Sequence, residues 1–182
     1  MKTYLLLILS ILGIVSTVDA QRRDYMTESE VELVRDHQDI DKRIEVLIRM
    51  IDRRLDLVTI TRPLATDKRL DKLEWGPEPQ GTRLQLLTDV KYLLQKAIDD
   101  IDNVSEHNKN SLEQNKTEGL LFPKSVRILA AAATRYLGPL KAESERTKDE
   151  KERGVLLQSI ESCELITESV KQLPPEVKKV KN

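Results

Sequence analysis

The sequence predicts an all-α protein: an antiparallel helical bundle of about four helices with one long irregular connection. Apolar residues recur at steps of three and four over long segments, which is the spacing of one helix face. No segment alternates apolar and polar residues with period two, and the β-branched and aromatic clusters typical of strands are missing. An antiparallel bundle is the simplest arrangement that buries several such faces against one another.

Residues 1–20 have the pattern of a signal peptide. Leu5 to Val15 is an apolar run of the length of a signal-peptide core. This run is shorter than the roughly 20 residues that a membrane-spanning helix needs. The expected cleavage lies between Ala20 and Gln21, because small residues precede that bond. We therefore expect a secreted or periplasmic protein with no stable membrane span after cleavage, and a single helical domain over residues 21–182.

The segment from Thr27 to Val58 has the clearest helical pattern in the chain. Thr27 and Glu30 fit a capping box, in which each side chain accepts a hydrogen bond from the other residue's amide. The apolar residues that follow fall within one arc of a helix, and charged residues lie outside it. The pattern predicts one continuous helix that packs against others. Its apolar face contains Leu33, Ile40, Ile44, Leu47, Ile48, Ile51, Leu55 and Val58.

A second helix is predicted from Thr82, because Thr82 and Gln85 fit another capping box. Its apolar face ends at Val104, and the polar, asparagine-rich residues 105–119 follow. This stretch is either a solvated extension of the helix or a loop. The apolar face contains Leu86, Leu87, Val90, Leu93, Leu94, Ala97, Ile98, Ile101 and Val104.

A third helix is predicted to begin near Pro123, because proline is accepted in the first turn of a helix. We expect Gly138-Pro139 to kink or break this helix, since proline lacks an amide donor and its ring crowds the preceding turn. The alanines in its apolar face would allow a neighbouring helix to approach closely. That face contains Val126, Leu129, Ala130, Ala133, Tyr136, Leu137 and Leu140.

A fourth helix is predicted after a turn near Thr147 to Asp149. The turn lies within a long charged run, so an arrangement of three helices stays open. Pro174-Pro175 should stop the fourth helix and leave a short lysine-rich tail over residues 174–182. The apolar face of this helix contains Val155, Leu156, Ser159, Ile160, Cys163, Ile166, Val170 and Leu173.

Residues 61–81 form the irregular connection between the first two predicted helices. The segment holds three of the seven prolines and the only tryptophan, Trp75. Helix connections are usually about 2–8 residues long, so this one is unusual. Residues 67–75 are compatible with a short helix. Trp75 is the candidate interaction residue: it is either an anchor in an interface, where tryptophan is enriched, or a lid over the end of the bundle.

The residue types that bind metals and cofactors are scarce. The chain has two histidines, and Val34 and Val104 stand three residues before them, where a di-iron bundle needs glutamate. We expect His37 at the edge of the bundle and His107 on the surface. The single cysteine, Cys163, rules out an internal disulfide and covalent haem attachment. It is expected in the core, and an intermolecular disulfide is the alternative.

Composition argues against several classes of function. The net charge is −1 with both signs interspersed, and aromatic residues make up 3% of the chain, so a nucleic-acid interface is not expected. No phosphate-binding loop, nucleophile elbow or metalloprotease helix is present in the sequence. We therefore expect no catalytic, cofactor-binding or metal-binding residues and no enzymatic activity. Asn103 and Asn115 match the glycosylation acceptor pattern, which matters only in a eukaryotic host.

Three segments carry a resemblance to a group of proteins. They are IDRRLDLV at residues 51–58, WGPEPQGTRLQLL at residues 75–87 and KERG at residues 151–154. Together with the signal peptide, they resemble uncharacterised secreted helical proteins of bacteria. The resemblance implies an envelope or periplasmic location. It carries no known activity, so it assigns no role to any residue.

Two classes of function follow. The first is a non-enzymatic module that binds another protein or an envelope component, with Trp75 at the interface and a homodimer as one possible assembly. The second is a small-ligand carrier with an apolar cavity between helices, lined by the small residues Ala130, Ala133 and Cys163. The sequence names neither the partner nor the ligand.

Overall fold

The computed structural model describes residues 23–63, 73–107 and 121–173, and every regular element in them is a helix. No strand is present in these three ranges. The all-α class predicted from the sequence is therefore confirmed. The elements are α1 (Glu28–Asp36), α2 (Ile40–Leu57), α3 (Arg83–His107), α4 (Leu121–Arg146), α5 (Glu150–Ser169) and the short 3-10 helix η2 (Val170–Gln172).

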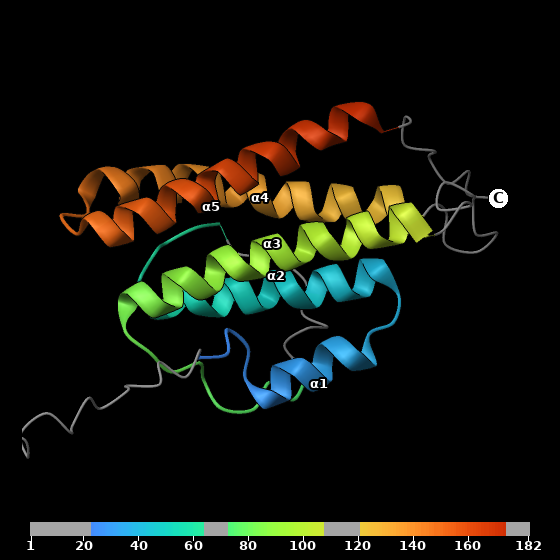
Figure 1. Ribbon diagram of the computed structural model, residues 1–182, viewed down its shortest axis with the longest axis horizontal. Helices are drawn as coiled ribbons and strands as arrows, with labels where there is room; N and C mark the ends of the chain where they lie inside the picture. Colours follow the sequence, from blue (N-terminus) through green and yellow to red (C-terminus); the bar gives the residue numbers. More distant parts are fainter. Residues whose placement is uncertain (1–22, 64–72, 108–120, 174–182) are drawn as a thin grey trace, which may run out of the picture.

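Helices α2, α3, α4 and α5 pack side by side around one core. Helix α2 contacts α3 and α4, while α5 contacts α3 and α4 (Figure 1). Helix α1 is shorter and contacts α2, on the side away from α4 and α5 (Figure 1). The groove described below lies among α3, α4 and α5, and the residues that hold α1 lie on the other side of the molecule.

The predicted apolar faces form the core. The buried members of the four faces include Ile44 and Leu47 of α2, Leu93 of α3, and Leu129 of α4. Leu33, Ile98, Val104, Leu137, Val155, Val170 and Leu173 from the same faces are partly buried and pack against this core. Three-and-four spacing thus identified the inward side of each helix correctly.

The prediction of one continuous helix from Thr27 to Val58 is wrong. The chain leaves helical geometry at His37 and re-enters it at Ile40, which separates α1 from α2. The ring of His37 donates a hydrogen bond from Nδ1 to the carbonyl of Leu33 at 2.6 Å. Arg43 Nε donates to the His37 carbonyl at 3.0 Å, so side chains satisfy the backbone groups that the break exposes.

The break allows α1 to fold back against α2. Glu30 of α1 then reaches Arg54 of α2, with two oxygen–nitrogen distances of 2.7 Å. In a straight helix these two residues, 24 positions apart, would be about 36 Å apart along the axis. The break is therefore accompanied by a buried ion pair, which one continuous helix could not form.

Proline 139 does not break the third predicted helix. Helix α4 runs from Leu121 to Arg146 with Pro139 inside it. Leu140 and Glu143, which follow the proline, are buried between helices. The helix therefore continues past the backbone hydrogen bond that proline removes. Of the two outcomes expected at Gly138-Pro139, a kink or a break, the break is wrong.

The predicted helix starts and the predicted turn are confirmed. At α1, Thr27 Oγ1 accepts from the Glu30 amide at 3.3 Å, and Glu30 Oε2 accepts from the Thr27 amide at 3.0 Å. At α3, Thr82 and Gln85 make the same reciprocal pair. The turn between α4 and α5 lies at residues 147–149, and Asp149 caps α5 by accepting from two backbone amides.

A buried polar cluster fixes the start of the long connection after α2. Arg62 Nε donates to Asp52 Oδ1 at 2.6 Å, and Tyr136 Oη of α4 donates to the same oxygen at 2.9 Å. Burial raises the pKa of Tyr136 well above its usual value. The connection therefore leaves α2 along a defined path beside α4.

Arg83, at the start of α3, contacts all three of the other long helices. Its Nη1 donates to the carbonyl of Val58, the C-cap of α2, at 2.5 Å. Its guanidinium also pairs with Glu143 of α4, and its Nε donates to Glu152 of α5 at 3.3 Å. This end of the bundle is closed by charged contacts.

Several predictions fall outside the described residues. They are the signal peptide at residues 1–20 with its cleavage after Ala20, the acceptor Asn115 and the tail at residues 174–182. The proposed short helix over residues 67–75 is described only from Leu73 onward, where the chain turns and the Trp75 amide donates to the Leu73 carbonyl at 3.0 Å. No helix among the described ranges is long and apolar enough to cross a membrane.

Candidate functional site

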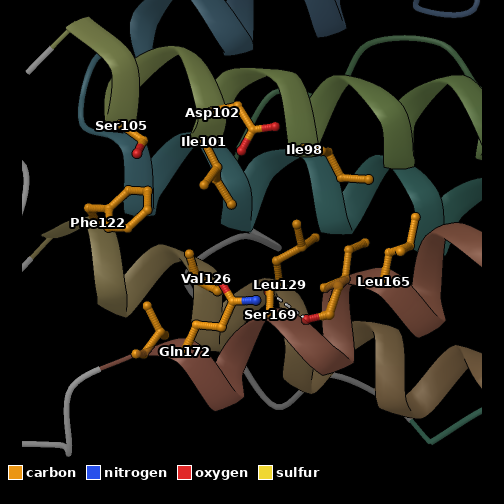
Figure 2. Close-up of a pocket in the computed structure, with 12 residues that line it drawn as sticks. Ile98, Ile101, Asp102, Ser105, Phe122, Val126, Leu129, Leu165, Ser169 and Gln172 are labelled. Atoms are coloured by element: carbon orange, nitrogen blue, oxygen red, sulfur yellow. Dashed lines mark hydrogen bonds between the residues drawn. The ribbon is translucent and has the colours of Figure 1, made fainter.

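A groove between α3, α4 and α5 is the candidate site. It has a volume of about 520 Å³ and opens to the surface beside η2 (Figure 2). This volume falls within the range of about 300–1,000 Å³ that is usual for small-molecule sites. The groove is lined by Ile98, Ile101, Asp102 and Ser105 of α3, Phe122, Val126 and Leu129 of α4, Leu165, Ile166 and Ser169 of α5, Gln172 of η2, and Leu173.

The floor of the groove is apolar and its rim is polar. Ile101, Val126 and Leu129 are buried and belong to the core, so they fix the floor in place. Asp102 and Ser105 are exposed, and Figure 2 shows both on α3 at the edge of the groove. An apolar floor with a few polar groups at the opening is the usual composition of a small-molecule site.

Leu165 is the most exposed large apolar residue at the groove. Its side chain lines the groove and is 63% exposed. One turn further along α5, Ser169 Oγ donates to the Ile166 carbonyl at 2.8 Å, so this hydroxyl already has a partner. A large aliphatic side chain therefore stands at the opening with nothing to cover it among the described residues.

The described lining of the groove holds no constellation for bond-making chemistry. Among the residues that the structure describes, the lining contains no histidine, cysteine, lysine or arginine, and Asp102 is its single ionisable side chain. A nucleophile with an adjacent base, or a pair of carboxylates, would be needed for hydrolytic chemistry. The arrangement can hold an apolar molecule and orient a polar end of it.

A second polar site lies outside the groove, in what we term the N-terminal ion cluster: Arg23, Glu30, Arg54 and Asp89. Arg23 pairs with both oxygens of Asp89 at 2.6 to 3.1 Å. Arg54 is 1% exposed, pairs with Glu30, and donates to the Tyr25 carbonyl at 2.7 Å. The cluster joins the N-terminal segment, α1, α2 and α3.

Asp89 has a raised pKa within this cluster. Burial raises the pKa of its carboxyl to about 6, against the opposing effect of the charges on Arg23 and Arg54. Perturbed groups often mark functional sites. Here the carboxylate is covered by Arg23 on its open side, and Asp89 does not line the groove. We therefore interpret the N-terminal ion cluster as structural.

Trp75 lies outside the groove, is partly buried and packs against the core. The guanidinium of Arg53 lies 5.4 Å from the centre of its ring, and Arg53 also donates to the Trp75 carbonyl. The next residue, Gly76, has φ +63°, and an added Cβ there would lie 2.2 Å from Ser29 Oγ. The connection between α2 and α3 thus packs closely against α1 at Gly76, and the Trp75 side chain in this connection is half-buried.

The remaining candidate residues lie apart from one another. His37 caps α1, and His107 is exposed at the end of α3. No group of three or more histidine, cysteine, aspartate or glutamate side chains within the described residues is arranged to hold a metal ion. Asn103 is exposed on α3.

Cys163 and the two alanines lie outside the groove. Cys163 is fully buried, as expected, and burial raises the pKa of its thiol to about 12. Ala130 and Ala133 are also buried. None of the three residues expected to line a cavity lines the groove. The small side chains instead belong to the packed interior between α4 and its neighbours.

Sequence reasoning missed the groove residues as a group. One signal was present: Leu157 and Leu165 lie off the predicted apolar face of α5, and they are 53% and 63% exposed. Of these two large apolar residues on the polar side of the helix, Leu165 lines the groove.

Comparison with known proteins gives no further guidance. No protein-family model, no curated protein and no solved structure matches the chain. The groove is interpreted from its own geometry.

Proposed function

We propose that this chain is a secreted or periplasmic, non-enzymatic binding protein that holds a small apolar molecule in the groove between α3, α4 and α5. The observation that carries the proposal is a groove of about 520 Å³ with an apolar floor and the exposed Leu165 at its opening. The proposal includes an antiparallel arrangement of α2 to α5, which their pairwise contacts support. The location follows from the apolar run at residues 5–15.

The size of the groove sets the apolar gain that is available to a ligand. Burial of one methylene group contributes about 0.8 kcal/mol, so eight buried methylenes would gain roughly 6 kcal/mol. Association costs at least about 4 kcal/mol, which leaves about 2 kcal/mol. A millimolar complex needs about 4 kcal/mol, so a ligand of useful affinity requires a longer chain or further contacts of its polar end.

The first test is titration with an apolar fluorescent dye such as N-phenyl-1-naphthylamine. The protein is purified from cells that express the full sequence. We expect saturable binding at one site, and we expect Leu165→Gln to weaken it at least about fivefold, since a polar side chain at the opening removes apolar contact. Leu157→Gln is the matched control, because Leu157 is also exposed on α5 but does not line the groove.

The outcomes separate cleanly. Both substitutions are at exposed positions, so both variants should keep the wild-type free energy of unfolding within about 0.5 kcal/mol. Loss of dye binding in the Leu165 variant alone supports the groove as the binding site. Equal binding by the wild type and both variants would place the dye elsewhere, and absence of saturable binding would reject the proposal.

A second candidate function is a module that binds another protein. Leu157 and Leu165 are exposed on α5, within an arc of about 80°, and one partner surface could cover both. Crosslinking in the expressing host, with each leucine replaced in turn, tests this candidate. If a partner protein contacts this side of α5, both substitutions should reduce the same crosslink. If the groove binds a small ligand instead, only the substitution of Leu165 should have an effect, and that effect should be on ligand binding.

A further inference from the structure

We infer that the groove takes an amphiphile with an aliphatic chain and a cationic head group, the chain lying along α3 and the head beside Asp102. This inference rests on the proposed function and adds the class of ligand. It follows from three features of the lining: the type of apolar side chain, the direction in which the lining runs, and the sign of charge at the rim.

The apolar lining is aliphatic. Phe122 is its single aromatic residue, and the other apolar residues are isoleucine, leucine and valine. Planar aromatic ligands gain specific stacking from aromatic side chains, and one phenylalanine supplies little of it. The lining also contains no side chain that ligates haem iron through nitrogen or sulfur. A flexible aliphatic chain matches such a surface better than a flat ring system.

The lining runs parallel to the helix axes. Ile98, Ile101, Asp102 and Ser105 of α3 follow the spacing of one helix face over two turns, a length of about 10 Å. On the opposite side, Leu165 and Leu173 bound a stretch of similar length along α5 and η2. Figure 2 shows residues of the two sides facing each other across the groove. The space is therefore a trough that suits an extended chain.

The rim is negative in sign. Asp102 is exposed and is the single ionisable side chain among the lining residues. Helix α5 continues directly into η2, whose last residue, Gln172, lines the groove, and the C-terminal end of a helix carries partial negative charge.

Neighbouring cations among the described residues have partners of their own. Lys171 of η2 pairs with Glu168 at 2.7 Å, and Lys124 of α4 pairs with the buried Asp41. Neither lysine lines the groove. An anionic head group would lie beside Asp102 without a cation in the described lining, whereas a cationic head group would gain a charge partner.

The test compares three probes that share a decyl chain: decyltrimethylammonium, decyl maltoside and decyl sulfate, each below its micelle concentration. Isothermal titration calorimetry gives the dissociation constant of each. We expect the cationic probe to bind about threefold to fivefold more tightly than the maltoside, the range of an exposed ion pair, and the sulfate to bind least tightly. The preference should shrink as salt concentration rises.

Asp102→Asn is the variant that decides the head-group assignment. We expect it to bring the affinities of the cationic probe and the maltoside to within about twofold of each other, and to leave the maltoside affinity unchanged. Asp99→Asn is the matched control, since Asp99 is also exposed on α3 but does not line the groove. Leu165→Gln should weaken all three probes, which shows that the chain occupies the groove.

Failure of this inference differs from failure of the proposed function. Equal affinities for the three probes, all reduced by Leu165→Gln, would overturn the cationic head group and leave the groove as a binding site. Tighter binding of the sulfate would overturn it in the same way. A cationic preference that survives Asp102→Asn would assign it to another part of the surface and overturn it too. Absence of binding by every probe would reject both.

Discussion

The N-terminal ion cluster and the groove differ in almost every physical respect. The ion cluster is charged and closely paired: Glu30, Arg54 and Asp89 are buried, and Arg23 covers Asp89 from the exposed side. The groove is open and apolar, and the one ionisable residue of its described lining lies at the rim. The ion cluster holds a carboxyl group with a raised pKa, that of Asp89, and the groove holds the open volume. A perturbed titration and available space thus occur in different parts of this molecule.

The largest expected effect comes from breaking the ion cluster. Arg54→Ala should lower the free energy of unfolding by about 3–5 kcal/mol, because it leaves Glu30 and Asp89 buried with fewer cationic partners. Urea unfolding followed by circular dichroism measures this. Arg53→Ala is the control, since Arg53 contacts Glu30 from a more exposed position and should cost less. A loss below about 1 kcal/mol for Arg54→Ala would show that the cluster adds little to stability.

The next effect concerns pH. The pKa of Asp89 is about 6 in the folded protein, above the value of about 3.9 in an unfolded chain. Binding of the proton therefore stabilises the fold; this contribution is complete below about pH 4 and is lost as the pH rises through about 6. From this group alone we expect the free energy of unfolding to fall by up to about 3 kcal/mol across that interval.

Asp89→Asn isolates this contribution. The variant cannot titrate at this position, so the difference between its free energy of unfolding and that of the wild type should change between pH 4 and pH 7. Urea unfolding at a series of pH values measures the difference. A difference that is constant, or that changes in favour of the wild type as pH rises, would mean that Arg23 and Arg54 outweigh the burial of the carboxylate.

The smallest expected effect comes from Trp75, which belongs to neither region. Trp75→Ala should lower the free energy of unfolding by about 1–2 kcal/mol, because it removes a half-buried side chain and its contact with Arg53. Trp75→Phe should lower the free energy of unfolding by a smaller amount. Thermal unfolding of the three proteins gives the comparison. A partner crosslink that disappears while stability is unchanged would instead identify Trp75 as an interface anchor.

The sequence predicted the structural features that depend on residues close to one another in the chain. Three-and-four spacing identified the inward faces, and the pairs Thr27 with Glu30 and Thr82 with Gln85 identified two helix starts. The turn before Asp149 was predicted for the same reason. These features are set within a few residues, so the local pattern contains the information.

What the sequence could not predict depends on contacts between distant residues. The break after α1 accompanies the ion pair of Glu30 with Arg54, and the continuity of α4 past Pro139 depends on packing with other helices. The groove depends on how far three helices stand apart, which no local pattern encodes. The exposed Leu165 was the one visible signal, because it lies off the apolar face of its own helix.

The position of Arg83 has a consequence for the order of folding. Helices α2 and α3, and likewise α4 and α5, are neighbours in sequence, so each pair can assemble at a modest cost in loop entropy. Arg83 belongs to the first pair, and its carboxylate partners Glu143 and Glu152 belong to the second, 60 and 69 positions away. Its full set of contacts can form only after both pairs have met. The contacts of the Arg83 guanidinium with Glu143 and Glu152 therefore form late in folding, and early folding species lack them.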